Sequence, residues 1–211
     1  VVTVLSKFKV KLSFQSIIKC ISTDKFIKAS AELMKLEQIT KQEHIDNLEL
    51  AKTSGKIAEG AVARFSTIVE SELGQIFSPD GIDIYTALQE NATILFVLNP
   101  LLYPELSPCF GRLALIDCKK AVARMCGEEK RKFFIFDEIS SYASMSLLDL
   151  VNKSRSAGVT SILATQSLAD LDTVSDNFRG QIIENCNNYI VLRQNSSNNA
   201  ESWANILGTR N

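Results

Sequence analysis

Two adjacent carboxylates follow a short apolar run near the middle of the chain. The run covers residues 133–136, and the acids are Asp137 and Glu138. At the end of a buried strand, Asp137 is suited to hold Mg²⁺ through a water molecule. Glu138 is suited to orient and deprotonate an attacking water. This is the Walker B pattern of nucleotide hydrolysis, although two acids that simply face solvent at a strand end would give the same letters.

Two further residues could serve the same chemistry. Gln166 follows the next apolar run, where its amide could contact a γ-phosphate and the attacking water; otherwise it is a surface amide in a loop. Arg155 lies near the end of a predicted helix that Gly158 closes. It fits either a favourable charge at a helix C-terminus or an arginine finger that reaches the phosphate of a neighbouring subunit.

The elements that must position these residues are short apolar runs separated by stretches of helical length. The runs cover residues 93–98, 133–136, 160–164 and 189–192. The helical stretches cover residues 105–126, 145–157, 177–185 and 199–207. This alternation predicts a mostly parallel sheet covered by helices on both faces. The groups after the four runs, at Asn99, Asp137, Gln166 and Arg193, should then meet at one sheet edge.

The first part of the chain has a different pattern. Residues 1 to about 75 show helical periodicity, with helices expected over 24–36 and from a capping box at Thr40 and Glu43 onward. Residues 7–12 alternate strictly between polar and apolar types, which is typical of a strand. We therefore predict a mainly helical domain over 1–75 and an α/β domain over 76–211.

Composition narrows the functional class. Hydrophobic residues make up 45% and charged residues 22% of the chain, and the net charge of -1 argues against binding polyanions through bulk charge. Five cysteines without a C-x-x-C pair and a single histidine make a zinc site an unattractive interpretation. No apolar run approaches the roughly 20 residues needed to cross a bilayer.

The phosphate-binding loop of nucleotide hydrolases is missing from the sequence. No G-x-x-x-x-G-K-[ST] occurs, and the one Gly-Lys pair, Gly55 and Lys56, is followed by Ile57. We therefore expect this chain to bind nucleotide poorly by itself. Because the sequence begins at Val1 rather than Met, we interpret it as a fragment.

Several blocks occur in the order found in a known family. They read KFFIFDEI at 132–139, RSAG at 155–158, ATQSLADL at 164–171 and AESWANILG at 200–208. Together they resemble the C-terminal half of the conjugative coupling proteins, the TraD/TraG family of type IV secretion. The resemblance covers residues 76–211, while residues 1–75 correspond by position to an all-α domain inserted in those proteins.

The resemblance implies a partial RecA-like, FtsK-like P-loop ATPase that forms a homo-hexamer and moves single- or double-stranded DNA. The family uses ATP and Mg²⁺, and works with relaxosome proteins and the secretion channel at the cytoplasmic side of the bacterial inner membrane. Its Walker A loop and membrane anchor precede the all-α domain. Carried over, Asp137 and Glu138 match the Walker B acids, Asp137 being the Mg²⁺ ligand through water. Gln166 matches the sensor glutamine and Arg155 the candidate arginine finger.

Other interpretations remain open. Channel-associated type IV secretion ATPases also carry a strand followed by Asp-Glu and an Ala-Thr-Gln-Ser-Leu block, although the block around Trp203 and Gly208 favours a coupling protein. The chain could instead be a non-catalytic module that binds DNA or relaxosome proteins through its helical part. It could also be an unrelated α/β protein with a chance Asp-Glu pair.

Overall fold

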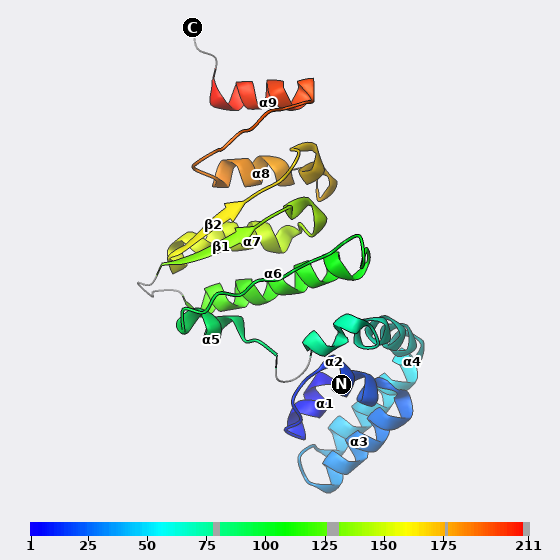
Figure 1. The fold of residues 1–211 in the computed structure, drawn as a ribbon. Helices are drawn as coiled ribbons and strands as arrows, with labels where there is room; N and C mark the ends of the chain where they lie inside the picture. The colour runs from blue at the N-terminus through cyan, green and yellow to red at the C-terminus, as the bar shows by residue number, and fades with distance from the viewer. Residues whose placement is uncertain (78–80, 126–130, 176, 209–211) are drawn as a thin grey trace. The chain divides into compact units, whose positions relative to one another are not determined.

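The chain divides into two units, Val1–Ile82 and Asp83–Asn211. The computed structural model describes residues 1–77, 81–125, 131–175 and 177–208 (Figure 1). The division falls after Ile82 rather than after residue 75, and each unit has its own hydrophobic core. The assignment of these units to an inserted domain and a motor domain stays a prediction.

All of the regular elements described in the first unit are helical. Its elements are α1 (Val2–Lys7), α2 (Phe14–Ile21), α3 (Thr23–Lys35), α4 (Lys41–Val69) and the 3₁₀ turn η1 (Glu72–Phe77). The predicted capping box is confirmed, because the Glu43 amide donates to the Thr40 hydroxyl at 3.1 Å and the Thr40 amide donates to the Glu43 carboxylate at 2.7 Å. These reciprocal bonds satisfy donors that a helix start leaves open, and so fix where α4 begins.

The prediction of a strand over residues 7–12 is wrong. Val4 and Leu5 of α1 are buried in the core of this unit, which favours a helix over the start of the segment. Lys9 then adopts a positive φ of 55°, and Val10 donates its amide to the Leu5 carbonyl at 3.3 Å. A left-handed residue of this kind interrupts extended backbone, so the alternating letters mark a turn after a helix.

The second unit mixes helices with a small parallel sheet. Its helices are α5 (Ile84–Gln89), α6 (Leu106–Arg124), α7 (Met145–Ser154), α8 (Phe178–Asn185) and α9 (Ser197–Leu207). Its strands are β1 (Lys132–Phe136) and β2 (Val159–Leu163), and short 3₁₀ turns lie at η2 (Ile139–Ser141), η3 (Arg155–Ala157) and η4 (Ala169–Thr173). The helices predicted over 105–126, 145–157, 177–185 and 199–207 are confirmed, except that residue 126 lies outside the described residues.

The two strands that carry the candidate site pair as predicted. β1 and β2 are parallel, with Lys132 opposite Val159 at the amino end and Phe136 opposite Leu163 at the carboxyl end. Gly158 ends η3 in a left-handed conformation with φ of 69° and turns the chain into β2. The mixed α/β character is thus confirmed, and a parallel βαβ connection through α7 places both strands' carboxyl ends at one edge.

The predictions of two further strands, after which Asn99 and Arg193 would follow, are wrong. Residues 93–98 and 189–192 form no strand, and within the described ranges the sheet has only β1 and β2. Their alternate side chains project into solvent, with Leu95 82% and Ile190 93% exposed. Apolar composition alone does not make a strand, because the backbone also needs a partner and the side chains need a covering layer. The RecA-like sheet of several strands therefore stays a prediction.

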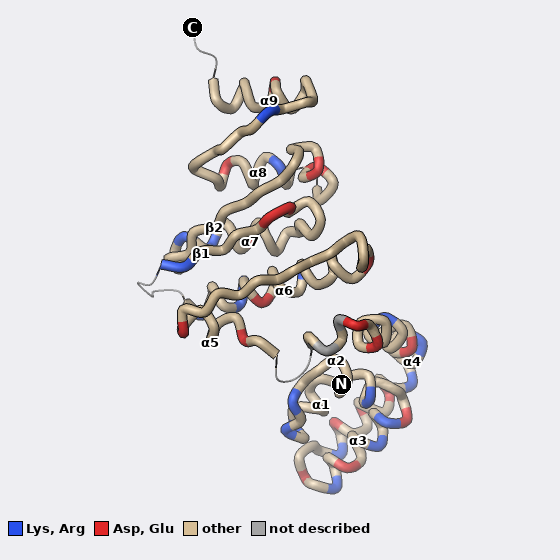
Figure 2. Tube along the Cα trace, viewed as in Figure 1, with Lys and Arg blue, Asp and Glu red and all other residues tan. Residues whose placement is uncertain are grey.

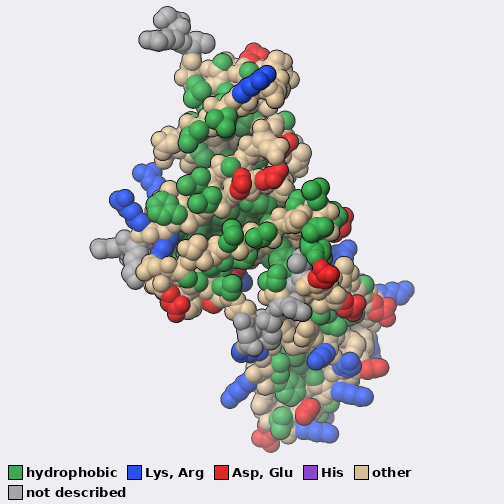
Figure 3. Space-filling model, in the orientation of Figure 1, with side chains coloured by type: hydrophobic (Ala, Val, Ile, Leu, Met, Phe, Trp, Pro, Cys, Tyr) green, Lys and Arg blue, Asp and Glu red, His purple; other side chains and the backbone are tan. Residues whose placement is uncertain are grey.

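The core of the second unit lies on one face of the sheet. Phe134 and Phe136 of β1 are buried with residues of α5, α6, α7 and α8. On the other face Phe133 is 64% and Ile135 70% exposed, as is much of Ile162 of β2. Hydrophobic side chains are visible on the surface of this unit in Figure 3. The prediction that helices cover both faces is wrong for the described residues.

In none of the described helices is there a stretch both long and apolar enough to cross a membrane.

Candidate active site

The loop after β1 carries the two acids and holds the second, Glu138, in an unusual backbone conformation. Asp137 and Glu138 are both exposed, and Glu138 adopts left-handed angles of φ 48° and ψ 49°. The Glu138 amide donates to Asp137 Oδ1 at 2.9 Å. Left-handed residues other than glycine are uncommon, and they cluster at functional sites where the surrounding structure holds them.

Tyr142 holds the loop after β1 in place through a hydrogen bond to its backbone. The Tyr142 hydroxyl donates to the backbone carbonyl of Asp137 at 2.9 Å. The ring lies directly against α6, where a Cβ added to Gly111 would come within 2.6 Å of Tyr142 Cβ. Burial, with Asp137 and Cys118 nearby, raises the pKa of Tyr142 from 10.0 to about 12. The hydroxyl therefore stays protonated and keeps donating well above neutral pH.

The loop after β2 meets the acids. Gln166 Nε2 donates to Glu138 Oε1 at 2.8 Å, although the two residues are 28 positions apart. Backbone bonds join the same loops, because Ala164 donates to the Phe136 carbonyl at 2.9 Å and Ile139 donates to the Ala164 carbonyl at 3.1 Å. The structure therefore brings together three of the four predicted site residues at the carboxyl edge of the sheet.

Arg155 lies at the opposite edge. It begins η3, immediately before β2, and its side chain is exposed. β2 starts at Val159, which pairs with Lys132 at the amino end of the sheet. Figure 2 shows acidic residues at the loop after β1 and basic residues around the strands' amino ends. The structure does not bring Arg155 to the acids of its own chain.

The other two groups expected at this edge have different surroundings. Asn99 Oδ1 accepts the amides of Leu101 and Leu102 at 3.1 and 3.2 Å, so it caps its own turn. Arg193 is exposed and follows the run that forms no strand. Of the four groups expected at this edge, only those in the loops after β1 and β2 are in contact.

Sequence reasoning missed the residues that support the site. Tyr142 carried no signal, since one tyrosine after an acidic pair fits many patterns. Ser167 links the β2 loop to α9, because its hydroxyl oxygen accepts from Asn199 Nδ2 at 2.9 Å and from the Ala169 amide at 3.1 Å. A bond between residues 32 positions apart has no local spacing that could reveal it.

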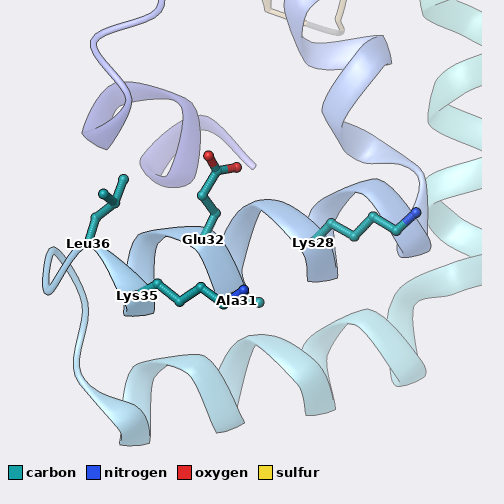
Figure 4. A pocket seen from close by; sticks show the side chains of 5 residues that line it. All are labelled: Lys28, Ala31, Glu32, Lys35 and Leu36. Atoms are coloured by element: carbon teal, nitrogen blue, oxygen red, sulfur yellow. The ribbon is translucent and has the colours of Figure 1, made fainter.

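Two features of the helical unit carry no comparable chemistry. An open hollow of ≈ 530 Å³ is lined by Lys28, Ala31, Glu32, Lys35 and Leu36, all from α3 or the residue that ends it (Figure 4). Ser30 shares a hydrogen bond of 2.9 Å with His44 Nδ1 and accepts one from Asn47. Since Ser30 is fully buried, no substrate reaches its hydroxyl, and these bonds join α3 to α4.

Comparison with known proteins gives the class of the second unit. Residues 131–211 match the family described as "TraM recognition site of TraD and TraG". The match contains β1, β2, α9 and all four predicted site residues. Residues 131–211 are therefore of the TraD/TraG type, as the order of the sequence blocks indicated.

One relative extends this finding. An uncharacterized protein of Mycoplasma pneumoniae is 31% identical over 100 residues, which are 46% of this chain and 67% of that protein. The two proteins belong to one family, although the relative's name assigns it no activity. No solved structure matches the chain.

Proposed function

We propose that this chain supplies the Walker B and sensor side of an ATP-driven DNA translocase, the coupling protein that connects a relaxosome to a type IV secretion channel. One observation carries the proposal: the hydrogen bond of 2.8 Å between Gln166 and Glu138 at the carboxyl edge of two parallel strands. In open parallel sheets, ligands bind outside this edge.

The acids have distinct parts in the proposed reaction. Asp137 uses Oδ1 to accept the Glu138 amide, which leaves Oδ2 for a hydrated cation. Glu138 would accept the proton of the attacking water. The Gln166 amide fixes the Glu138 carboxylate while its own carbonyl oxygen remains available to the water or to a phosphate oxygen. Together these groups orient a water without a covalent enzyme intermediate.

The donor set fits Mg²⁺ bound mainly by water and phosphate. In the portions of the chain that the structure describes, no group of three His, Cys, Asp or Glu residues could hold a metal. Mg²⁺ sites of nucleotide hydrolases use one or two protein oxygens and leave the remaining positions to water and nucleotide. When bound, ATP and Mg²⁺ would supply the phosphoanhydride and the positive charge that stabilises its displacement.

The β- and γ-phosphates need a cradle that this sequence does not contain, since no Walker A motif occurs in it. We propose that a P-loop outside residues 1–211 completes the site in the full protein. A membrane anchor outside these residues would place it at the cytoplasmic side of the inner membrane. A homo-hexamer would place Arg155 of one subunit at the nucleotide of the next.

The test is DNA-stimulated ATP hydrolysis by a protein that joins this chain to its P-loop region. Glu138→Gln keeps shape and hydrogen bonding but removes the base, so turnover should fall by about 10²–10⁴-fold. Gln166→Ala should also lower turnover, while Gln194→Ala, which removes an amide that donates to the nearby Leu192 carbonyl, should not. Wild-type turnover in Glu138→Gln would refute the catalytic assignment, and hydrolysis by residues 1–211 alone would refute the need for a separate P-loop.

A second function is favoured by the family match. Since residues 131–211 match a region described as a TraM recognition site, we propose that they bind a relaxosome protein of the TraM type. Calorimetry of the chain with purified TraM from the same conjugative system should show saturable binding, and the helical unit alone, residues 1–82, should not bind. Equal binding by both would move the contact to the helical unit. No binding by either would contradict the proposal.

A further inference from the structure

The loop that carries Gln166 is tied to the last helix through one serine. Ser167 Oγ accepts a hydrogen bond from Asn199 Nδ2 of α9 at 2.9 Å. The same oxygen accepts the Ala169 amide at 3.1 Å, and the Thr165 hydroxyl donates to the Ser167 carbonyl at 3.1 Å. Both sides of Gln166 are therefore held, and one of the holding bonds comes from α9.

The path from α9 to the acids is short and continuous. Gln166 is the residue before Ser167, and its amide donates to Glu138 at 2.8 Å. The backbone bond from Ile139 to the Ala164 carbonyl joins the two loops a second time. A displacement of Ser167 therefore acts on a loop whose other contacts lead directly to Glu138.

α9 is held less firmly than the elements beneath it. None of its residues is buried, whereas α7 has four buried residues. Trp203 packs edge-on against Tyr189, with ring centroids 5.7 Å apart, and is partly buried against the core of the unit. Elements with few buried contacts open more readily than the core, and the Asn199 bond is one of the contacts that dock this helix.

We propose that Asn199 is a positioning residue: through Ser167 it couples the docking of α9 to the Gln166–Glu138 contact. A partner that stabilises the docked position of α9 would then favour the arrangement in which Gln166 orients Glu138. A partner that separates α9 from Ser167 would release Gln166. The effect on hydrolysis rests on the proposed function, whereas the coupling between the two contacts is a property of the chain itself.

The coupling is tested by hydrogen exchange on the 211-residue chain. Asn199→Ala should raise exchange several-fold not only in α9 but also in residues 137–143 and 164–169. Emission of Trp203, the only tryptophan, should shift to longer wavelength as α9 loosens. Asn198→Ala, on the same helix, is the matched control and should leave the exchange of residues 137–143 and 164–169 unchanged. Exchange that rises in α9 alone, or in both variants equally, overturns the proposal.

A conservative variant separates positioning from general loss of stability. In Asn199→Asp the Ser167 hydroxyl can donate to the new carboxylate, so the link is restored with its polarity reversed. This variant should return exchange in residues 137–143 close to the original rate. Ser167→Ala breaks the same bond from the other side and replaces Asn199→Ala if that chain does not fold. Failure of Asn199→Asp to restore the protection would count against the bond as the cause.

Hydrolysis is measured separately in the protein that includes a P-loop. Asn199→Ala should lower kcat several-fold and leave KM for ATP unchanged, because the bond orients the water-activating group rather than the nucleotide. An unaltered protein without ATPase activity would refute the proposed function, and the exchange result would still decide the coupling. Normal kcat in Asn199→Ala would overturn the link to hydrolysis.

Discussion

The two edges of the same pair of strands differ in almost every physical respect. At the carboxyl edge both acids are exposed, and Glu138 has a left-handed backbone conformation. The Gln166 side chain of the second loop donates a hydrogen bond to Glu138 of the first. At the amino edge, Lys132 is buried and its Nζ donates to Asn91 Oδ1 at 2.5 Å. The carboxyl edge exposes its polar side chains to solvent, whereas the amino edge is joined to the turn after α5 by a buried lysine.

This difference constrains the role of Arg155. The strands have five residues each, so the two edges lie about 13 Å apart at the usual rise of roughly 3.3 Å per residue. An arginine at the amino edge is therefore too far away to serve the acids of its own chain. If Arg155 takes part in hydrolysis, it does so at a neighbouring subunit.

The largest expected effect is the loss of ATP hydrolysis when Arg155, at the amino edge, is replaced. Arg155→Ala should reduce hydrolysis by the assembled motor about 10³-fold or more, as loss of an arginine finger does. The free energy of unfolding should change by less than ~0.5 kcal/mol, because the side chain is exposed. Both are measured on the protein that includes a P-loop, by ATPase assay and by denaturant titration.

Mixed assemblies provide the control for Arg155. Subunits with Arg155→Ala and subunits with Glu138→Gln are each inactive alone, but together they form some interfaces with an intact acid and an intact arginine. Partial recovery of turnover on mixing is expected. If mixing restores nothing, Arg155 does not act between subunits.

Tyr142 supports the loop at the carboxyl edge, and a larger residue at Gly111 should disturb its packing. A methyl group there would lie 2.6 Å from Tyr142 Cβ and 2.7 Å from its Cγ, so Gly111→Ala should lower the free energy of unfolding by ~1–3 kcal/mol. Gly180→Ala is the matched control, since nothing lies within 4 Å of its added Cβ. That helical substitution should raise stability by roughly 0.5–1 kcal/mol. Urea titration distinguishes the two, and equal changes would contradict the close packing.

The amino edge can be tested at Lys132. Lys132→Ala removes the buried stem and leaves the Asn91 amide oxygen without its donor, which should destabilise the chain by ~1–3 kcal/mol. The neighbouring Arg131 is exposed, and Arg131→Ala should change stability by less than ~0.5 kcal/mol. A neutral Lys132→Ala in denaturant titration would show that this edge is not fastened as described.

The smallest effect near neutral pH is a pH dependence at the carboxyl edge, which appears only above pH 10. The pKa of Tyr142 is raised to about 12 in the folded chain, so its neutral form is favoured by folding. That contribution is complete below pH 10 and is lost as pH rises through 12. Stability of the unaltered chain should therefore fall more steeply above pH 10 than stability of Tyr142→Phe. Parallel slopes would indicate that Tyr142 titrates normally.

The sequence predicted the parts of the fold that depend on local pattern. The capping box at Thr40, the helices of the second unit and the two paired strands follow from neighbouring residues and periodicity. It also predicted that Glu138 and Gln166 lie near each other, because consecutive parallel strands end at one edge. These results need no knowledge of distant contacts.

The errors concern features that depend on a partner. The runs at 93–98 and 189–192 have the composition of strands but lack a hydrogen-bonded neighbour in the described residues. The links through Tyr142, Ser167 and Asn199 join positions whose separation follows no period. The position of Arg155 could have been derived, because a helix that follows the carboxyl end of one parallel strand must return to the amino end of the next.

The outward face of the sheet affects how this chain behaves in solution. Phe133 and Ile135, together with Ile162 of β2, present an apolar surface beside strands whose outer edges are unpaired within the described ranges. Such surfaces associate with one another, and heating adds further exposed strand backbone. Thermal unfolding of the isolated chain would then be irreversible, with a midpoint that moves with scan rate and protein concentration.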